Sequence, residues 1–589
     1  MPFYQFSFAF PNAGTAGALR KPRELTRRTT ALLLLYGLTL LLIHLGDARV
    51  LTRHEAFAAQ PGREMLNNGR FADWMLPKLA GAPREAKPPG MMWLIAASIY
   101  IFRTSAAWAA RFPSAMAAMA VALMIAHLAA RWFGDRIGRL AGLLQVSFSY
   151  IILQAKLSEA DMSLVAAVCA ALCLFARGTI DSPFGKATGW RARLTFWLAC
   201  GAAFLLKGPI GLIFVLLTIV TFLFVRRRHG ERDWQPLWWL ANPLGIACFI
   251  ILVVIWPLVA WRLDPTIVQV WHSEMAGTAN GQFDSEPFYY YLGSIPVVLL
   301  PWTPLVIIGL WRGPNMELAG KLVSQGDRAM LWRFLLCWFI PGVIFLSLAM
   351  KMKHHHYPMP VLPPLTIPAA LGLDYYVRRQ MSRPQGLVWP WFLGGCIAAG
   401  AIVNAVPSIP HDFKPPILRL IAIFAVGGLI YLHFERQRRP SLMIAACFLT
   451  LWAAAVGEQT WLMPVQDDYR YQADFARAAN GLVPPGVPIY MLGHREEEQE
   501  AEYAYYLRFP MQRLQSAEDF KQIVAKQNAP TYAIAPAGFL PELTGVGQIQ
   551  TLSKCSGLRP KETESDRFEL LRVIPAGSDT PSLKASSGP

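Results

Sequence analysis

The chain has 589 residues, of which 54% are apolar and 16% charged, and its formal net charge is +17 at pH 7. This composition excludes an ordinary water-soluble enzyme and indicates a membrane protein. Lys and Arg occur in short clusters between apolar runs, without a basic stripe interleaved with aromatic residues, so nucleic acid is not an expected partner.

Apolar runs close to the length of a membrane-crossing helix recur through most of the chain and predict an α-helical polytopic fold with about thirteen spans. A single cleavable signal peptide does not explain so many runs. They lie at residues 29–46, 105–130, 140–155, 162–176, 194–206, 209–225, 237–260, 291–311, 332–350, 358–376, 387–405, 417–434 and 441–462.

Alternate loops between these runs are basic throughout, which fixes the predicted orientation. Residues 1–28 and the basic loops are assigned to the cytoplasm, and an odd number of spans then places the tail outside. The basic clusters include Arg23, Arg27, Arg28, Arg131, Arg136, Arg139, Arg177, Arg191, Arg193, Arg226, Arg227, Arg228, Arg312, Arg378, Arg379, Arg436, Arg438 and Arg439. The C-terminal domain is therefore expected on the side of the membrane opposite the cytoplasm.

The first outer loop, 48–104, is too polar to cross the membrane but carries a helical pattern. Its segment RHEAFAAQPGREML, residues 53–66, predicts an amphipathic helix that lies at the membrane surface. Pro61 favours a short turn near 60–62 within it. Downstream, two prolines follow Lys87 and stiffen the chain as it returns to the membrane.

Acidic residues are nearly absent from the runs, and the ionisable side chains gather in the outer loops. The membrane domain is assigned to 29–464. Because the ionisable residues lie in its outer loops, any chemistry is expected at its outer rim. A carboxylate stays ionised there at lower cost than at mid-bilayer, and a lysine can bind a lipid-borne phosphate. The candidates are Glu55, Glu64, Glu85, Lys87, Glu159, Asp161, Lys207, His272, Glu274, Lys351, Lys353, His354, His355 and His356.

The tail changes character and predicts a small α/β domain over 465–575, followed by a Ser-, Gly- and Pro-rich disordered end, 576–589. Helices are expected near 469–481, 496–507 and 516–527. Strands are expected at VPIYML, TYAIAP and FELLRVIP.

A series of short motifs occurs in a fixed order between about residues 20 and 380. They are HEAFAAQPGREML, KLAGAPREAKPPGMMWL, SAAWAARFPSA, LSEADMSL, LLKGPIGL, EPFYYYLGSIPVVLLPWTP and KMKHHHYPMPVLPPL. In this order they resemble the aminoarabinose-transferase and protein-mannosyltransferase family of the GT-C superfamily. That family implies an inverting membrane glycosyltransferase that uses a sugar linked to polyprenyl (undecaprenyl) phosphate.

The resemblance implies roles for individual residues. Glu55 and Asp161 match the loop carboxylates expected in catalysis, and the residues expected to bind the donor phosphate are Lys87, Lys207, Tyr357 and Lys353. Contacts to the acceptor or the sugar are assigned to Glu85, His272, Glu274 and His356. Lipid A or another lipopolysaccharide is the expected acceptor. The resemblance also implies the bacterial inner membrane as the location, with the N-terminus in the cytoplasm and the C-terminal domain in the periplasm.

The chain departs from the family pattern at places that bear on a metal. His54 replaces the usual aspartate before Glu55, Ala86 stands where a glutamate usually precedes the lysine, and Met275 follows Glu274 where one branch has histidine. A divalent metal held by Glu85 and His272 therefore remains an open alternative, and no other cofactor is implied.

Several simpler interpretations stand beside these assignments. Glu55 is also suited to an ordinary surface helix, Asp161 to the N-cap of a span, and Lys87 to snorkelling. The other functions compatible with the sequence are a protein O-mannosyltransferase, a lipid or polysaccharide transporter or flippase, and an inactive scaffold or sensor. A transporter would place ionisable groups deep within its spans, whereas here they lie at the outer rim.

Overall fold

The computed structural model describes most of the chain. The described residues are 24–46, 51–79, 82–83, 87–180, 189–229, 235–280, 285–313, 325–382, 388–406, 409–467, 471–493, 503–507, 511–514, 516–527, 529–557 and 563–575. Glu85, most of the N-terminal segment 1–28, most of the expected helix 496–507 and the expected disordered end 576–589 lie outside this set.

The chain forms two compact units, each made of two separate stretches. The first, called here the helical unit, contains residues 1–47 and 85–463. The second, called the sheet unit, contains residues 48–84 and 464–589. The stretch 48–104, taken from the sequence as one loop of the membrane domain, is thus divided after residue 84.

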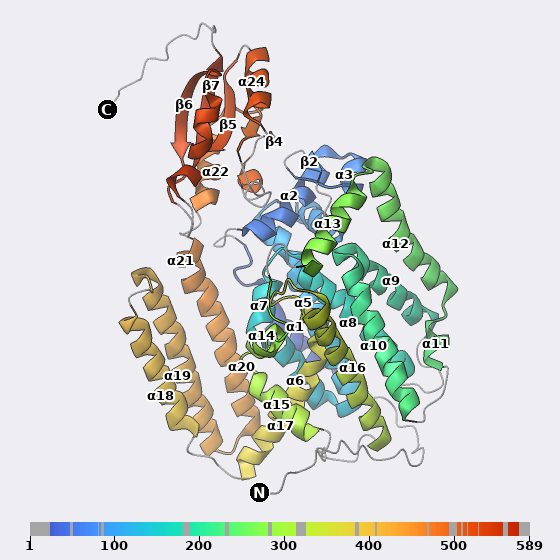
Figure 1. The fold of residues 1–589 in the computed structure, drawn as a ribbon. Helices are drawn as coiled ribbons and strands as arrows, with labels where there is room; N and C mark the ends of the chain where they lie inside the picture. The colour runs from blue at the N-terminus through green and yellow to red at the C-terminus, as the bar shows by residue number, and fades with distance from the viewer. Residues whose placement is uncertain are drawn as a thin grey trace. The chain divides into compact units, whose positions relative to one another are not determined.

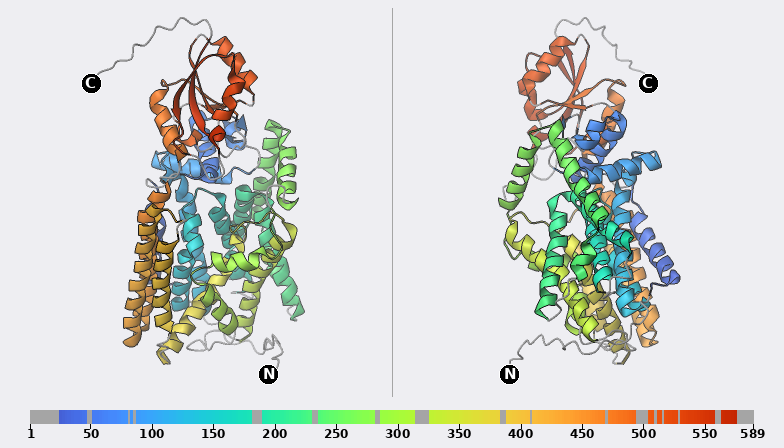
Figure 2. Two further views of the ribbon diagram at one scale, coloured as in Figure 1. Left: turned by 60° about the vertical axis from the view of Figure 1, so that its left-hand side comes forward. Right: turned by 90° about the vertical axis from the view of Figure 1, so that its right-hand side faces the viewer.

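Each predicted run coincides with a helix or a bent helix pair of the helical unit (Figures 1 and 2). Seven described helices are long and apolar enough to cross a membrane, or nine if each bent pair counts once; the bends are 64° between α6 and α7 and 105° between α14 and α15. The elements are α1 (Arg27–Leu42), α5 (Ala107–Phe133), α6 (Asp135–Ser147), α7 (Ser149–Ala155), α8 (Ala160–Thr179), α9 (Trp190–Lys207), α10 (Pro209–Arg228), α12 (Pro243–Leu263), α14 (Tyr290–Val298), α15 (Thr303–Arg312), α16 (Gln325–Ala349), α17 (Thr366–Ser382), α18 (Val388–Ala405), α19 (Lys414–Arg436) and α20 (Pro440–Gly457).

Shorter helices join the spans: α4 (Gly90–Phe102), α11 (Gln235–Leu240) and α13 (Ile267–Asn280). Local sequence explains several helix starts. Thr26 caps α1 by accepting the amide of Thr29, Asn242 caps α12 by accepting the amide of Gly245, and Pro209 occupies the first position of α10.

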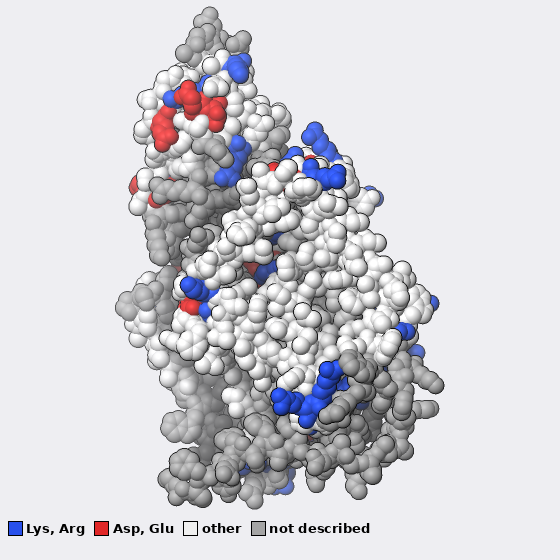
Figure 3. Space-filling view, turned by 45° about the vertical axis from the view of Figure 1, so that its right-hand side comes forward, with Lys and Arg blue, Asp and Glu red and all other residues white. Residues whose placement is uncertain are grey.

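Basic residues end several of the long helices at one end of the helical unit. The last turns of α5, α8, α10, α15, α17 and α19 contain Arg131, Arg177, Arg226, Arg227, Arg228, Arg312, Arg379 and Arg436. Figure 3 shows a broad uncharged face on the helical unit, with Lys and Arg gathered near its lower edge. This distribution is the one expected for a multi-pass membrane protein.

The sheet unit is built on a five-stranded mixed sheet of order β4-β3-β5-β7-β6. Its strands are β3 (Ile489–Met491), β4 (Met511–Arg513), β5 (Thr531–Pro536), β6 (Gly547–Lys554) and β7 (Phe568–Pro575). β3 is parallel to β4 and β5, whereas β7 is antiparallel to β5 and β6. The expected strands are β3, β5 and β7, and the expected helices α22 (Tyr471–Leu482) and α24 (Ala517–Lys526) are present, but the sequence did not indicate β4 or β6.

The first-loop segment folds with this sheet unit. α2 (Arg53–Asn68) is one continuous helix, so the turn expected at Pro61 is wrong. The guanidinium of Arg63 donates to the carbonyls of Tyr505 and Ala504, each at 2.7 Å, and lies over the Tyr505 ring. α3 (Phe71–Met75) and the two-stranded pair β1 (Lys78–Leu79) and β2 (Ala82–Pro83) follow.

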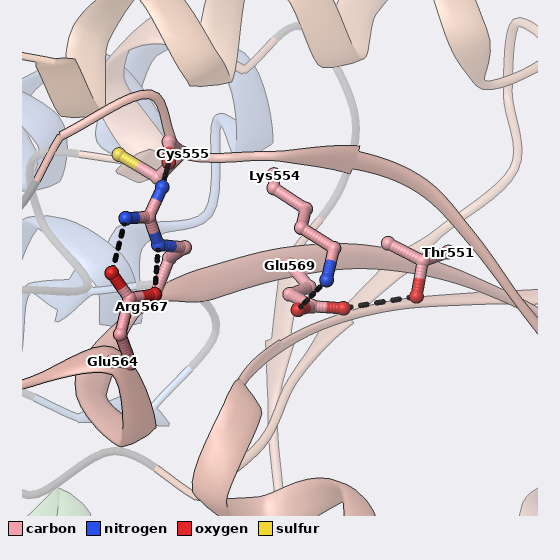
Figure 4. A network of polar contacts seen from close by, with 6 residues as sticks. All are labelled: Thr551, Lys554, Cys555, Glu564, Arg567 and Glu569. Atoms are coloured by element: carbon pink, nitrogen blue, oxygen red, sulfur yellow. Dashed lines mark hydrogen bonds and ion pairs between the residues drawn. The ribbon is translucent and has the colours of Figure 1, made fainter.

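Polar contacts fasten β6 to β7 at the edge of the sheet (Figure 4). The buried carboxylate of Glu569 accepts the Thr551 hydroxyl at 2.9 Å and pairs with the Lys554 ammonium at 2.8 Å. Next to it, Arg567 binds Glu564 through two nitrogens and donates to the Cys555 carbonyl. The two contacts of Glu569 lie on either side of the β-bulge between Thr551 and Ser553, so they stabilise the strand pairing there.

Candidate functional site

A tight turn positions Lys207 at the end of α9. Gly208 follows with φ +70° and ψ −152°, a backbone conformation that favours glycine, and Pro209 then starts α10. The motif KGP thus ends one helix and begins the next within three residues. The Lys207 side chain stands at this turn with 22% of its surface exposed.

The segment containing Lys87 packs onto the same turn. A Cβ on Gly90, the first residue of α4, would lie 2.5 Å from the Leu205 carbonyl oxygen, so the start of α4 can approach α9 this closely only with glycine. Pro88 lies next to Gly208. The exposed Lys87 is thereby held close enough to Asp161 and His356 to act on both electrostatically.

Asp161 and Lys207 form an ion pair at the centre of this cluster. Their Oδ1 and Nζ atoms are 2.6 Å apart, and Asp161 is buried. Asp161 lies in the first turn of α8, where the helix dipole favours a carboxylate. The N-cap of α8 is Glu159, which makes no side-chain capping bond, so the capping interpretation of Asp161 is wrong.

Aromatic side chains line one side of the pair. The Lys207 ammonium lies 5.3 Å from the centre of the Tyr357 ring. His356 and His354 stack with ring centres 5.3 Å apart, and each meets Tyr357 edge-on. Burial lowers the pKa of His356 to about 3, against the opposing effect of Asp161, so this imidazole is neutral. Burial also raises the pKa of Tyr357, which therefore keeps its hydroxyl proton.

Helix α13 brings one further acid to this group. The amide of Lys351 donates to the Ala279 carbonyl, which joins the end of α13 to the loop that leads to Tyr357. Glu274, half-buried on α13, acts electrostatically on Tyr357. His272 is exposed on the same helix.

Lys353 has a different environment from the one expected of a phosphate ligand. It is buried, and its ammonium donates to the carbonyls of Glu286 and Met350 at 2.9 and 2.6 Å. These hydrogen bonds hold in place the loop that precedes His354. The structure therefore gives Lys353 a supporting contact and leaves Lys87 and Lys207 as the lysines of the cluster.

Glu55 belongs to the sheet unit. It is buried and occupies the third position of α2, where it forms a capping box with Thr52. Its Oε2 accepts the Thr52 amide at 2.8 Å, and the Thr52 hydroxyl accepts the Glu55 amide at 3.2 Å. Glu55 therefore has a structural contact in addition to the role that the resemblance implies.

Two buried cations near the outer rim were not picked out from the sequence. Lys156, at the end of α7, donates to the Ile43 carbonyl at 2.9 Å, and Arg111 donates to the Leu45 carbonyl at 3.1 Å. Both hold the chain where it leaves α1. The sequence did offer a signal for these two residues, because Lys156 lies in the motif KLSEAD and Arg111 in ARFPSA, next to or within apolar runs. A cation in such a position needs a hydrogen-bonding partner.

The described residues contain no group of three or more His, Cys, Asp or Glu side chains that could hold a metal ion. Glu85 lies outside the described residues, and His272 is exposed. The alternative of a metal held by Glu85 and His272 is therefore not tested by the described residues.

Comparisons with known proteins show which proteins this chain is similar to in sequence. A family model described as dolichyl-phosphate-mannose-protein mannosyltransferase matches residues 86–261. Undecaprenyl phosphate-alpha-4-amino-4-deoxy-L-arabinose arabinosyl transferase of Edwardsiella ictaluri is 28% identical over 412 residues, covering 66% of this chain and 69% of its own. The corresponding transferase 2 of Proteus mirabilis is 26% identical over 411 residues, with the same coverage.

The fold has a solved counterpart. The crystal structure of ArnT from Cupriavidus metallidurans bound to undecaprenyl phosphate matches 94% of this chain and 98% of its own, with a TM-score of 0.71 and 20% identity. Its apo state matches with a TM-score of 0.70. The fold predicted from the motif order is therefore confirmed.

Proposed function

We propose a donor and an acceptor for this chain, which by sequence similarity and fold is an ArnT-like GT-C membrane glycosyltransferase. The donor is a sugar carried on undecaprenyl phosphate, and the acceptor is lipid A or another lipopolysaccharide component. Transfer takes place at the periplasmic face of the bacterial inner membrane, which is the side opposite the basic helix ends.

One observation carries this proposal: Lys207, paired with Asp161 at 2.6 Å, has its ammonium over Tyr357 and lies in a cluster that includes Lys87. A lysine has three N–H donors, and Asp161 occupies one of them. The remaining donors, with Lys87, can bind the phosphate that leaves as the sugar is transferred. Charge neutralisation of this kind is the main requirement when the leaving group is already a phosphate.

The pair also bears on the acceptor. Asp161 has one oxygen engaged with the Lys207 ammonium, so it is better suited to holding that lysine than to removing a proton. A hydroxyl acceptor needs a general base, whereas a phosphate acceptor is nucleophilic without one. We therefore favour a phosphate of lipid A as the nucleophile.

Glu274 suggests the kind of sugar. It is half-buried beside Tyr357, and among the described residues no cation pairs with it. The transferases from Edwardsiella and Proteus are named for a 4-amino-4-deoxy sugar. An amino sugar would bring an ammonium group that a carboxylate such as Glu274 can bind. We assign Glu274 to this contact.

Mass spectrometry of envelope lipids tests the donor and acceptor together. Cells that express the gene should show lipid A with an added amino-pentose mass, and cells without it should not. An unchanged lipid A profile would contradict the acceptor assignment. In purified protein, Lys87→Ala should weaken undecaprenyl-phosphate binding about tenfold or more, because it removes one charge-assisted contact; Lys351→Ala, an exposed lysine outside the pair, is the control.

A protein acceptor is the second candidate, because the matching family model is that of protein mannosyltransferases. It predicts transfer to serine or threonine side chains. Incubation of the purified protein with donor and either lipid A or an acceptor peptide separates the two, since sugar on the peptide alone would favour this second function.

A further inference from the structure

A groove lies between α19 and α20, on a part of the helical unit that the proposed reaction does not use. Its volume is about 500 Å³. α19 and α20 lie side by side in Figures 1 and 2. Gly427 allows the two helices to approach, because a Cβ there would lie 2.1 Å from the Thr450 hydroxyl oxygen.

The lining is apolar except at one end. Thr450 donates its hydroxyl to the Ala446 carbonyl at 2.7 Å, which leaves no unsatisfied hydroxyl facing the groove. Arg419 is the only charged residue among the described lining residues. Its guanidinium lies 5.5 Å from the centre of the Trp461 ring, and no carboxylate among the described residues pairs with it.

The position of this arginine within a spanning helix needs a reason. Arg419 lies on the first part of α19, at the opposite end from Arg436 and the basic turn with Arg438 and Arg439. Near the end of a membrane helix, an exposed arginine side chain can reach the level of the lipid headgroups, where a phosphate can bind it. Trp461, in the π-helical turn Glu458–Leu462 after α20, marks the interface at that end.

The length of the groove matches a single membrane leaflet. On α19 it runs from Arg419 to Ile430, which is about 16 Å along a helix. Half of the hydrocarbon core is about 15 Å. An acyl chain of one leaflet fits this length, whereas an undecaprenyl chain is too long for it.

We propose that this groove binds one anionic glycerophospholipid from the leaflet opposite the basic helix ends. One acyl chain lies against Gly427 and Thr450, and the phosphate binds Arg419, whose planar guanidinium suits a bidentate contact. A zwitterionic lipid would bring an ammonium group, and the described lining offers no carboxylate to receive it. The site is separate from the Asp161–Lys207 pair.

Native mass spectrometry of the full-length protein, titrated with phosphatidylglycerol or phosphatidylethanolamine, tests this site. The wild type should retain one phosphatidylglycerol under conditions that remove phosphatidylethanolamine. Arg419→Gln should weaken phosphatidylglycerol retention about tenfold or more, because a charge-assisted contact is lost. Ala453→Phe, which fills the groove and keeps the arginine, should also weaken it.

The matched control is Arg312→Gln. Arg312 lies over Trp311 at 4.4 Å, so it has the same contact with a tryptophan, but it does not line the groove. Its phosphatidylglycerol retention should equal that of the wild type. Equal retention by Arg419→Gln and wild type, equal retention of both lipids, or the same loss in Arg312→Gln would each overturn the proposal.

Discussion

Two buried aspartates of the helical unit form ion pairs in different ways. Asp374 on α17 pairs with Arg136 and Arg378, each at 2.8 Å, and both arginines are nearly half exposed. Asp161 on α8 pairs with the single Lys207 at 2.6 Å, surrounded by Tyr357 and histidines. Guanidinium groups make planar, fixed contacts, whereas an ammonium retains rotatable donors. The Arg136 pair holds α6 to α17, and the Arg378 pair lies within α17. In the lysine pair, the Lys207 side chain keeps 22% of its surface exposed.

The largest expected effect is on sugar transfer by Asp161→Asn. Loss of the carboxylate removes the partner that fixes Lys207, so we expect turnover by purified protein to fall about 10²- to 10³-fold. The thermal midpoint in detergent should change little. Near-normal turnover would show that the pair has no part in the reaction.

Lys207→Arg sharpens the comparison, because it gives Asp161 the same kind of partner as Asp374. A guanidinium can engage both carboxylate oxygens, and its other donors are then fixed in one plane, so they cannot turn toward a phosphate as the donors of an ammonium can. We expect kcat/KM to fall about 30-fold while the folded protein stays at least as stable. The reciprocal variant Arg378→Lys should transfer sugar at the wild-type rate; if it loses as much activity as Lys207→Arg, the distinction between the two pairs is wrong.

Asp374→Asn should affect stability and spare chemistry. Its loss removes two ion pairs whose arginines are partly screened by solvent, so the free energy of unfolding should fall by about 1–2 kcal/mol. Transfer per folded molecule, corrected by size-exclusion chromatography, should remain within about twofold of wild type. A selective loss of turnover without any loss of stability would contradict this role.

The smallest effect expected is a pH dependence from His356. Burial lowers its pKa from 6.5 to about 3, so the unfolded chain binds a proton at pH values where the folded chain does not. The stability that depends on the neutral imidazole is complete above pH 6.5 and declines as the pH falls toward 3. Thermal midpoints should therefore fall more steeply on acidification in wild type than in His356→Asn, and parallel curves would exclude this effect.

Much of the helical unit could be predicted from the sequence, because many of its helices are long and apolar and several end in basic residues. The turn that positions Lys207 follows from the KGP motif, since glycine and proline define it locally. Tertiary contacts set the rest. The Lys353 ammonium donates to the carbonyls of Glu286 and Met350, and no local sequence pattern indicates these two bonds. Likewise, α2 continues through Pro61, although the local sequence favours a turn.

The assignment of 48–84 to the sheet unit was missed for the same reason, since it depends on contacts between residues far apart in sequence. The sequence pattern around Arg63 indicates an amphipathic helix, but it does not indicate that this helix packs against residues near Tyr505. β6 was missed because its side chains alternate poorly between buried and exposed, and β4 because it has only three residues.

The bond between Arg63 and the Tyr505 carbonyl joins residues 442 positions apart. At ordinary rates of protein synthesis, the ribosome takes about 20 to 90 s to make the chain between them. During that time most of the membrane helices are inserted, while α2 is already made and its binding partner is not. The contacts of α2 with the rest of the sheet unit can therefore form only after the last part of the chain has been synthesised.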